Sequence, residues 1–496
     1  MSPDSELIAE ALLLATAEDL DAGAIASVAN GRSVLITPEL AAPVAQIRAE
    51  AVARLGSGAP VYGVNTGMGG QSHITLDPAS EQRQQDTLML ARAVGSPPWL
   101  SRRQARATLA TRLRTFLNGD AAVSVELCRR LAELLNADVM PAIPATGMGA
   151  AGEIIALAHV GGLITGSGAA LAPDGVASIP AAQALATVGM GSFHLGTKEG
   201  VALLQGVPTT TALAILLTPR ARFLADLVAV MTGVGVAVIG ASRDPYSAPL
   251  GRADDQLAQA LTRIREVAGD DPTPRALQAP LSFRVVGPAL AHAERCIKAV
   301  DDAVERALVG VTDSPAFVAG SFMGTAGFDG FDLAASLDAL CVALCHLAET
   351  SVARLHRLLD DRVTGLPRQL SDRPGLHAGM VVVHKRGVGV IHQLRRSLAP
   401  SSLGTIETSL GHEDVQSFSL ESARAAQSTL DALTEVLACE LLAVHQAVLL
   451  GGQPTGLGAD GFRLLRRAVE VVPSGTTDRP FGLDITALQE QLTAGW

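Results

Sequence analysis

Long apolar segments with helical spacing dominate the chain beyond about residue 200. One of them is LCVALCHLAETSVARLHRLL at 340–359, and another is ESARAAQSTLDALTEVLACELLAVHQAVLL at 421–450. In the first, apolar or small residues recur at steps of three and four, at Leu340, Leu344, Leu347, Ser351, Leu355 and Leu358. Such steps place side chains on one face of an α-helix. These segments predict long helices packed into a bundle.

The first 200 residues have a more mixed pattern. RSVLITPELAAPVAQIRAEAVARL at 32–55 fits a strand followed by a helix, and residues 101–139 have helical spacing interrupted by Asn-Gly-Asp at 118–120. Frequent alanines, with only two Trp and two Tyr, suit closely packed helices. We therefore predict a mainly α protein with a mixed α/β part at 1–200 and a long-helix bundle at 201–496.

Charge and cysteine content exclude several classes of protein. The net charge of −11 argues against a nucleic-acid binder, because no basic patch is available to neutralise phosphates. The five cysteines have no disulfide or zinc spacing, which favours buried free thiols and predicts no metal site. Long apolar runs such as LADLVAVMTGVGVAVIGAS, which includes Asp226, are interpreted as helices buried in protein rather than in lipid. The first residues lack the pattern of a signal peptide, so we expect a cytoplasmic protein.

Two glycine-rich segments predict tight turns near a candidate functional site. PATGMGAAGEIIALAHV at 144–160 crowds small residues around Ala150, Ala151 and Gly152, where the backbone can approach another group closely. VYGVNTGMGG at 61–70 contains Tyr62. A phosphate-binding loop would carry Lys-Ser or Lys-Thr before a helix, and neither is present.

Six motifs in chain order carry a family resemblance. They are VYGVNTGMGG (61–70), LLNADVMPAIPATGMGAAGEIIALAHV (134–160), KEGVALLQG (198–206), TDSPAF (312–317), GSFMG (320–324) and SLGHEDVQS (409–417). In this order they resemble the histidine and aromatic amino acid ammonia-lyase family, from about residue 25 to residue 450. The resemblance implies a homotetramer around a large helical core, a small amino acid-derived substrate, and active sites assembled from more than one subunit.

The resemblance also exposes a departure at Ala151. Family members normally carry Ala-Ser-Gly where this chain has Ala150-Ala151-Gly152. Their tripeptide cyclises and loses the serine hydroxyl to form a methylidene-imidazolone (MIO), the electrophile that activates the substrate. Ala151 has no hydroxyl to lose, so we expect no MIO and no other cofactor.

Several site residues follow from the resemblance alone. Tyr62 matches the tyrosine that acts at the reacting carbon as base or proton carrier, with a structural tyrosine as the alternative. Arg284 matches the arginine that holds the substrate carboxylate, with a structural salt bridge as the alternative. Gln278 matches a site glutamine, whereas the family's nearby tyrosine is replaced by Leu281.

Further positions match less directly. Glu413 corresponds to the glutamate that faces the substrate amine or side chain, and Asp414 beside it is expected to be a structural partner. Gln205 stands where the family usually has asparagine, and Phe322 matches an aromatic packing residue. Leu90 aligns loosely with a histidine of the histidine-specific members.

Lys385 interrupts an apolar stretch, GMVVVHKRGVGVIHQL, where the family has an apolar or small residue. Two interpretations stay open: the side chain of Lys385 is solvated, or it lies in the pocket. If it points inward, it pairs with Glu413, and the two hold a polar ring by donor and acceptor.

These features predict an MIO-independent carbon–nitrogen lyase of the ergothionase type, which eliminates an activated amine such as trimethylamine from a histidine-derived or similar betaine. The alternatives are a repurposed enzyme that performs elimination, cyclisation or dehydration on another small molecule, and a non-catalytic relative. Conventional deamination of histidine or an aromatic amino acid is the least favoured activity.

Overall fold

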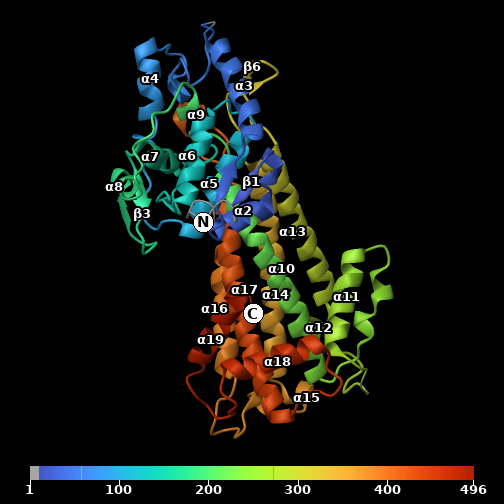
Figure 1. Cartoon of the computed structure of the whole chain (residues 1–496). Helices are drawn as coiled ribbons and strands as arrows, with labels where there is room; N and C mark the ends of the chain where they lie inside the picture. Colours follow the sequence, from blue (N-terminus) through green and yellow to red (C-terminus); the bar gives the residue numbers. More distant parts are fainter. Residues whose placement is uncertain (1–10, 57, 272, 496) are drawn as a thin grey trace, which may run out of the picture. The chain divides into compact units, whose positions relative to one another are not determined.

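A computed structural model describes residues 11–56, 58–271 and 273–495. The chain divides into two compact units (Figure 1). Unit 1 contains residues 1–216, 300–336 and 400–423, and unit 2 contains residues 217–299, 337–399 and 424–496. Unit 1 thus includes the whole predicted N-terminal part and adds two later segments, which carry Phe322 and Glu413.

Unit 1 combines short helices with two-stranded sheets. Its strands are β1 (Leu12–Leu14), β2 (Val34–Ile36), β3 (Ala169–Leu171), β4 (Ser178–Pro180), β5 (Ala316–Val318) and β6 (Ser321–Met323). Its helices are η1 (Ala17–Asp19), α2 (Ala22–Ala29), α3 (Pro38–Leu55), η2 (Gly69–Gln71), α4 (Pro78–Thr87), α5 (Arg102–Leu117), α6 (Val125–Asn136), α7 (Ile154–Thr165), α8 (Ala181–Thr187), α9 (Glu199–Leu204) and η6 (Ser409–Gly411). β1 and β2 pair in parallel, and the other two sheets are antiparallel hairpins. The predicted strand and helix at 32–55 are β2 and α3, and the predicted interruption at 118–120 separates α5 from α6.

Unit 2 is built almost entirely from helices. Four long helices contribute residues to both units: α10 (Pro208–Val238), α13 (Val286–Val309), α14 (Phe331–Leu358) and α17 (Ser419–Gly451). Those confined to unit 2 are η3 (Asp244–Tyr246), η4 (Ala248–Gly251), α11 (Asp255–Ala268), α12 (Leu281–Arg284), α15 (Asp361–Thr364), η5 (Arg368–Leu370), α16 (Val381–Arg396), α18 (Ala459–Val471) and α19 (Phe481–Thr493). This content confirms the mainly α prediction.

The long helices of unit 2 pack through the face that the sequence predicts. Every residue of the predicted apolar stripe of α14, from Leu340 to Leu358, is fully buried. Within unit 2, Arg354 of α14 donates to both carboxylate oxygens of Glu440 of α17, at 2.7 and 2.8 Å. Arg220 of α10 donates to Thr434 of α17 at 2.9 Å. Such polar pairs between helices, one of them fully buried, fix which faces of the helices meet.

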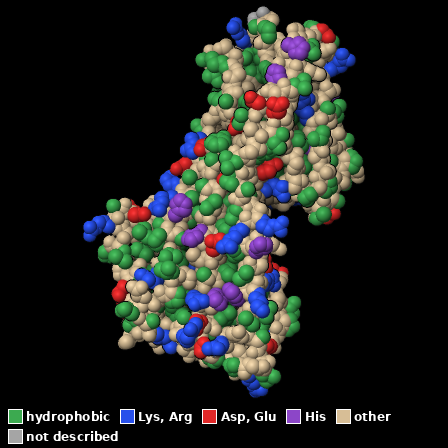
Figure 2. Space-filling model, turned by 180° about the vertical axis from the view of Figure 1, so that it is seen from behind, with side chains coloured by type: hydrophobic (Ala, Val, Ile, Leu, Met, Phe, Trp, Pro, Cys, Tyr) green, Lys and Arg blue, Asp and Glu red, His purple; other side chains and the backbone are tan. Residues whose placement is uncertain are grey.

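Among the described residues, three helical segments are long and apolar enough to cross a membrane by length and composition: Glu199–Val238, Phe331–Leu358 and Ser419–Gly451. Within the protein, 72%, 61% and 78% of their most apolar windows are already buried. All five cysteines are buried free thiols, as predicted. On the face seen in Figure 2, acidic and basic side chains are interspersed.

Candidate active site

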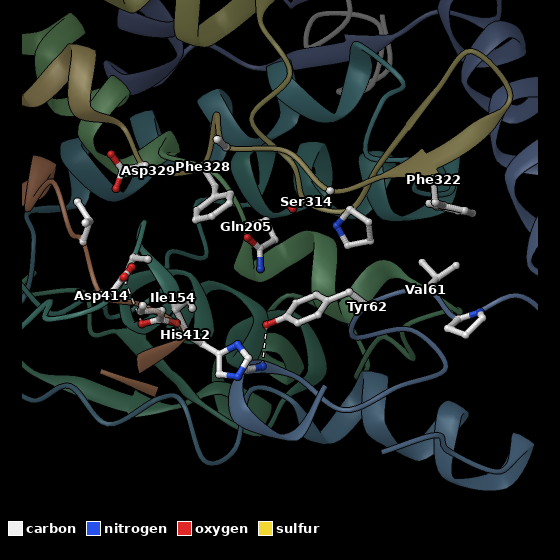
Figure 3. Close-up of a pocket in the computed structure, with 18 of the residues that line it drawn as sticks. Val61, Tyr62, Ile154, Gln205, Ser314, Phe322, Phe328, Asp329, His412 and Asp414 are labelled. Carbon is white, nitrogen blue, oxygen red and sulfur yellow. Dashed lines mark hydrogen bonds between the residues drawn. The ribbon is translucent and has the colours of Figure 1, made fainter. Parts of the chain in front are cut away.

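A cavity of about 810 Å³ opens in unit 1. Every residue that lines it belongs to this unit, although the residues come from loops far apart in the sequence. The lining residues are Arg54, Ala59, Pro60, Val61, Tyr62, Gly69, Ala151, Ile154, Gln205, Ser314, Pro315, Ser321, Phe322, Gly324, Ala326, Phe328, Asp329, His412, Glu413, Asp414 and Val415. Figure 3 shows that the ring of Tyr62 and the side chains of Gln205 and Phe328 lie toward the middle of the view.

The loop that carries Tyr62 is held by its own polar side chains. Asn65 accepts from the N–H of Val61 at 2.7 Å and donates to the carbonyl of Ala59 at 2.9 Å. The hydroxyl of Thr66 accepts from the N–H of Gly63 at 3.1 Å, where φ is +68°. These side-chain contacts add to the backbone hydrogen bonds of this segment, such as the one from the N–H of Gly67 to the carbonyl of Ile74, and fix the turn. They explain why Asn and Thr follow the tyrosine in this motif.

The loop at Ala150–Gly152 is compact and meets the cavity. The N–H of Ala151 donates to Oε2 of Glu413 at 3.3 Å. Gly152 has φ of +67°, and a Cβ at this position would stand 2.8 Å from the carbonyl oxygen of Phe328. Glycine is therefore required here on both conformational and steric grounds. The loop keeps a tight shape, but the side chain at 151 is a methyl group without the hydroxyl that MIO formation needs, so these residues do not fit the prosthetic group.

Glu153 fastens the end of this loop to the start of α10. Its side chain is buried and accepts from the N–H of Thr209 at 2.7 Å and from the N–H of Thr210 at 2.6 Å. Burial raises the pKa of Glu153, and these hydrogen bonds act in the opposite direction. A carboxylate at a helix N-terminus is stabilised by the free N–H groups there. These contacts hold the Ala151 loop against the start of α10 within unit 1.

Glu413 lies on a second loop that closes on itself. The N–H of Thr408 donates to the carbonyl of Glu413 at 2.9 Å, and the hydroxyl of Thr408 donates to Oε2 of Glu413 at 2.7 Å. Gln416 donates to the same threonine hydroxyl at 3.1 Å. With the bond from Ala151, these contacts orient the Glu413 carboxylate beside the degenerate tripeptide.

A buried ion pair supports the opposite wall. The ammonium of Lys198 pairs with Asp313, and both side chains are buried. The residue after Asp313, Ser314, lines the cavity, and the buried Arg112 donates to the carbonyl of Gln205. Burial is the main cause that lowers the pKa of Lys198 and raises that of Asp313. Because removing one partner would leave a buried unpaired charge, the pair fixes this wall.

Charge and aromatic surface are unevenly distributed around the cavity. Three lining residues are carboxylates, Asp329, Glu413 and Asp414, and Arg54 is the lining arginine. Burial is the main cause that raises the pKa of Asp329. Three aromatic rings, those of Tyr62, Phe322 and Phe328, also line it. Carboxylates and aromatic faces together suit a ligand with a positively charged group.

The cavity brings together five of the predicted site positions: Tyr62, Ala151, Gln205, Phe322 and Glu413. Asp414, expected to be a structural partner, lines the cavity as well. Phe322 of β6 lies opposite Phe317 of β5, with ring centroids 5.1 Å apart. Leu90 is 57% exposed and does not line the cavity.

Four other residues named from the resemblance belong to unit 2. Arg284 donates to the side-chain oxygen of Gln278 at 2.9 Å, so the predicted carboxylate binder and the predicted site glutamine contact each other. Leu281, at the start of α12, is 66% exposed. Lys385 lies on α16 with an exposed side chain, and its pairing with Glu413 stays a prediction.

Sequence reasoning missed several lining residues. Phe328 and Asp329 lie beyond the GSFMG motif, and His412 is the direct neighbour of Glu413 within a motif that was recognised. His412 was the easiest of these to predict from the sequence, because a polar neighbour of a site residue in a tight loop often lines the same cavity. Phe328 could not be predicted from the sequence, since only the folded chain places its backbone beside Gly152. Among the described residues there is no group of three or more His, Cys, Asp or Glu side chains that could hold a metal.

Comparison with known proteins places these features in one family. A model of the family described as aromatic amino acid lyase matches residues 20–470. The chain is 30% identical to the histidine ammonia-lyase of Anaeromyxobacter dehalogenans (strain 2CP-C), covering 97% of this chain and 99% of the relative. Tyrosine aminomutase from Streptomyces globisporus is similar in structure, with a TM-score of 0.91 and 26% identity over 98% of this chain and 97% of the other.

The fold is also that of ergothionase, an ergothioneine-degrading enzyme from Treponema denticola. Its structure in complex with desmethyl-ergothioneine sulfonic acid gives a TM-score of 0.92 and 24% identity, over 98% of this chain and 99% of that one. The family model and the relative matched over its full length agree with the ordered motifs of the sequence. Residues of these motifs line the cavity. The chain therefore belongs to the aromatic amino acid lyase family, a family of carbon–nitrogen lyases.

Proposed function

We propose that the protein is an MIO-independent lyase that eliminates an activated amine, such as trimethylamine, from a betaine derived from histidine or a similar amino acid. The observation that carries this proposal is the methyl side chain of Ala151, in a loop that otherwise keeps its tight fold beside Tyr62 and Glu413. Without a hydroxyl at 151, the tripeptide has no group from which the electrophilic methylene can form.

The cost of losing the electrophile argues for a substrate that brings its own leaving group. If the electrophile supplies even ~7 kcal/mol of transition-state stabilisation, its loss slows elimination of ammonia by about 10⁵-fold. A trialkylammonium group carries a permanent positive charge and leaves as a neutral amine. It needs no covalent activation by the protein.

The charges of the cavity support a substrate that carries a cationic group. A quaternary ammonium group has no N–H donors and is recognised by negative charge and by aromatic faces. Asp329 and Asp414 supply the charge, and the rings of Tyr62 and Phe328 supply the faces. An ergothioneine-degrading enzyme is built on the same fold, which supports the plausibility of such a reaction on this scaffold.

The elimination balances with the groups of this chain. The Tyr62 oxygen, as phenolate, takes the proton from the β-carbon, and the electrons of that C–H bond form the new C=C bond. The bond between the α-carbon and nitrogen breaks, and trimethylamine leaves with its electron pair. The products are an unsaturated acid and the free amine, and the proton on Tyr62 passes to solvent before the next turnover.

Residues of unit 2 complete the site in this proposal. Arg284 binds the substrate carboxylate in a two-pronged fashion, and Lys385 with Glu413 holds the polar ring. Their family counterparts lie in sites shared between subunits, so we propose that a second copy of the chain provides them within a homotetramer. The five free thiols accord with a reducing cytoplasm.

The test is incubation of the purified protein with ergothioneine and with histidine betaine. The conjugated product is followed by ultraviolet absorbance, and trimethylamine is measured separately. We expect both products in equal amounts from at least one betaine, with Tyr62→Phe as the inactive control. Absence of both products from both substrates would overturn the proposal.

A repurposed enzyme of the same fold is the second candidate, favoured by Gln205. This side chain lines the cavity and is one methylene longer than the asparagine that the family usually has there. A different small molecule undergoing elimination, cyclisation or dehydration would then be the substrate. This second candidate predicts Tyr62-dependent turnover of a molecule that is not a betaine. If the protein is instead a non-catalytic relative, we expect ligand binding without turnover in both the wild type and Tyr62→Phe.

A further inference from the structure

A second cavity, of about 460 Å³, lies within unit 2 and has a basic lining. It is formed by the end of α14, by α15 and η5, and by the start of α16. Its basic side chains are those of His356, Arg357, Arg362, Arg368 and His384. None of these five residues lines the cavity of unit 1, and the proposed lyase reaction uses none of them.

The two histidines and Arg357 form a continuous set of contacts. The imidazole rings of His356 and His384 are stacked, with their centroids 4.7 Å apart and their planes at 18°. Nη2 of Arg357 lies 2.8 Å from Nδ1 of His356. Because a guanidinium donates hydrogen bonds and cannot accept them, Nδ1 accepts this bond and the ring hydrogen is on Nε2. His356 therefore keeps an N–H donor for another partner.

Asp360 shows how this cluster holds an anionic oxygen. Its Oδ2 lies 2.9 Å from Nη2 of Arg362 and 3.9 Å from Nη1 of Arg357, so two guanidinium groups approach one oxygen. Its Oδ1 accepts from Nε of Arg362 at 3.0 Å. The side-chain hydrogen bond from Arg362 is the main cause that lowers the pKa of Asp360 to about 2, so this carboxylate is ionised. Guanidinium groups bind phosphate oxygens with the same paired geometry.

The arginines carry more donors than the two aspartates use. Arg368 donates to Oδ1 of Asp361 at 3.1 Å through Nε, and its Nη groups have no partner among the described residues. Nη1 of Arg362 is likewise unused within the described part of the chain. The side chains of Arg362 and Arg368 are 82% and 70% exposed, so a ligand can reach these donors from solvent. Several unused N–H groups at one cavity suit a ligand with several acceptor oxygens.

The balance of charge at this cavity is positive. Three arginines line it together with two aspartates, Asp360 and Asp361, which leaves one net positive charge when both imidazoles are neutral. Burial lowers the pKa of His384, and the positive charges of His356 and Arg357 lower it further. An anion in the cavity would offset these charges. The net charge of −11 disfavours a long polyanion, whereas this cavity requires only one anionic group.

We propose that the cavity between α14, α15, η5 and α16 binds a small molecule through a phosphate group. A phosphate presents three acceptor oxygens and close to two negative charges. It therefore matches the unused N–H groups of Arg362, Arg368 and His356 better than the two oxygens of a carboxylate do. The group is supplied by free inorganic phosphate or by a phosphate monoester. This site goes beyond the proposed lyase function and does not depend on it.

The test is isothermal titration calorimetry of the full chain at neutral pH. The ligands are inorganic phosphate, adenosine monophosphate, and adenosine as the control without phosphate. We expect one Arg368-dependent site per chain for a phosphate-bearing ligand and none for adenosine. The tighter of the two phosphate ligands identifies the source of the group. Acetate, with two acceptor oxygens and one charge, should bind at least about tenfold more weakly.

Three variants locate the binding. Arg368→Met should weaken the affinity for phosphate by about tenfold, the size of a lost charge-assisted hydrogen bond. Asp361→Asn removes a competing negative charge and frees Nε of Arg368, so it should strengthen the affinity. Arg373→Met removes an exposed arginine that does not line the cavity and is the matched control for net charge, with no change expected.

Absence of binding of both phosphate and adenosine monophosphate to the wild type would overturn the proposal. An unchanged affinity in folded Arg368→Met would do the same, as would equal weakening in Arg373→Met, because the attraction would then come from the surface charge in general. Circular dichroism monitors folding. If Arg368→Met does not fold, Asp361→Asn decides, and an affinity no tighter than that of the wild type overturns the proposal. None of these measurements needs turnover, so their failure and the failure of betaine elimination are distinguishable.

Discussion

The loop of Tyr62 and the loop of Ala151 both line the cavity of unit 1, and they differ in what each has kept. The first is fixed by Asn65 and Thr66 and still presents a titratable side chain. The second is fixed by Gly152 and by the buried Glu153, but it presents only a methyl group. In the proposed account, backbone and reactive side chain are therefore separable: the Ala151 loop shapes the cavity, and the Tyr62 loop supplies the reactive group.

The largest expected effect tests the reactive loop. Tyr62→Phe removes the proposed base and leaves the Asn65 and Thr66 contacts in place. We expect elimination from histidine betaine to fall by about 10³-fold, within the range that general bases contribute, with little change in Tm. The rate of trimethylamine release measures the elimination, and calorimetry measures Tm. Retention of more than a tenth of the wild-type rate would refute the assigned role.

Glu413 joins the two loops, since it accepts from Ala151 and faces the same cavity as Tyr62. Glu413→Gln keeps the shape of the side chain and removes its charge. We expect kcat/KM for the betaine to fall by about 10–100-fold, the size of a lost charge-assisted hydrogen bond. Steady-state kinetics give the value. An unchanged kcat/KM would mean that Glu413 only orders the loop.

The Ala151 loop is tested through its stability. Gly152→Ala places a Cβ against the carbonyl of Phe328 in a left-handed backbone conformation. We expect a loss of about 1–3 kcal/mol, seen as a lower Tm by calorimetry. Gly149→Ala is the matched control in the same segment, because a Cβ there would meet nothing within 4 Å. Equal Tm values for the two variants would show that the loop is not tightly held.

The smallest effect distinguishes the chemistry of that loop from its backbone. Ala151→Ser restores the hydroxyl without changing the position of Cβ. We expect the stability of the uncyclised chain to change by less than about 0.5 kcal/mol, as for most substitutions that keep the local packing. Calorimetry of freshly purified protein provides the comparison. A large destabilisation would mean that the methyl group itself is needed for packing.

The sequence predicted the helical part of the fold well, because a stripe such as Leu340 to Leu358 reports its own burial through spacing. At the cavity, the sequence predicted only part of the lining. Tyr62, Gln205 and Glu413 lie in recognisable motifs and meet in one cavity. Phe328 and Asp329 were missed, since their place beside Gly152 depends on how a separate loop packs, which no local pattern records.

Arg284 and Lys385 illustrate a different limit. Arg284 matches a position of a family site, and Lys385 replaces an apolar or small residue of the family. Both belong to unit 2, whereas every residue lining the cavity belongs to unit 1. A motif match proposes the role of a residue, and it does not say where in the fold that residue lies.

The intact mass of the purified wild-type protein most directly tests whether Ala151 has removed the electrophile. We predict the mass of the unmodified sequence, with no dehydration at residues 150–152. A mass lower by two water molecules per chain, traced by peptide mapping to Ala150–Gly152, would contradict the account.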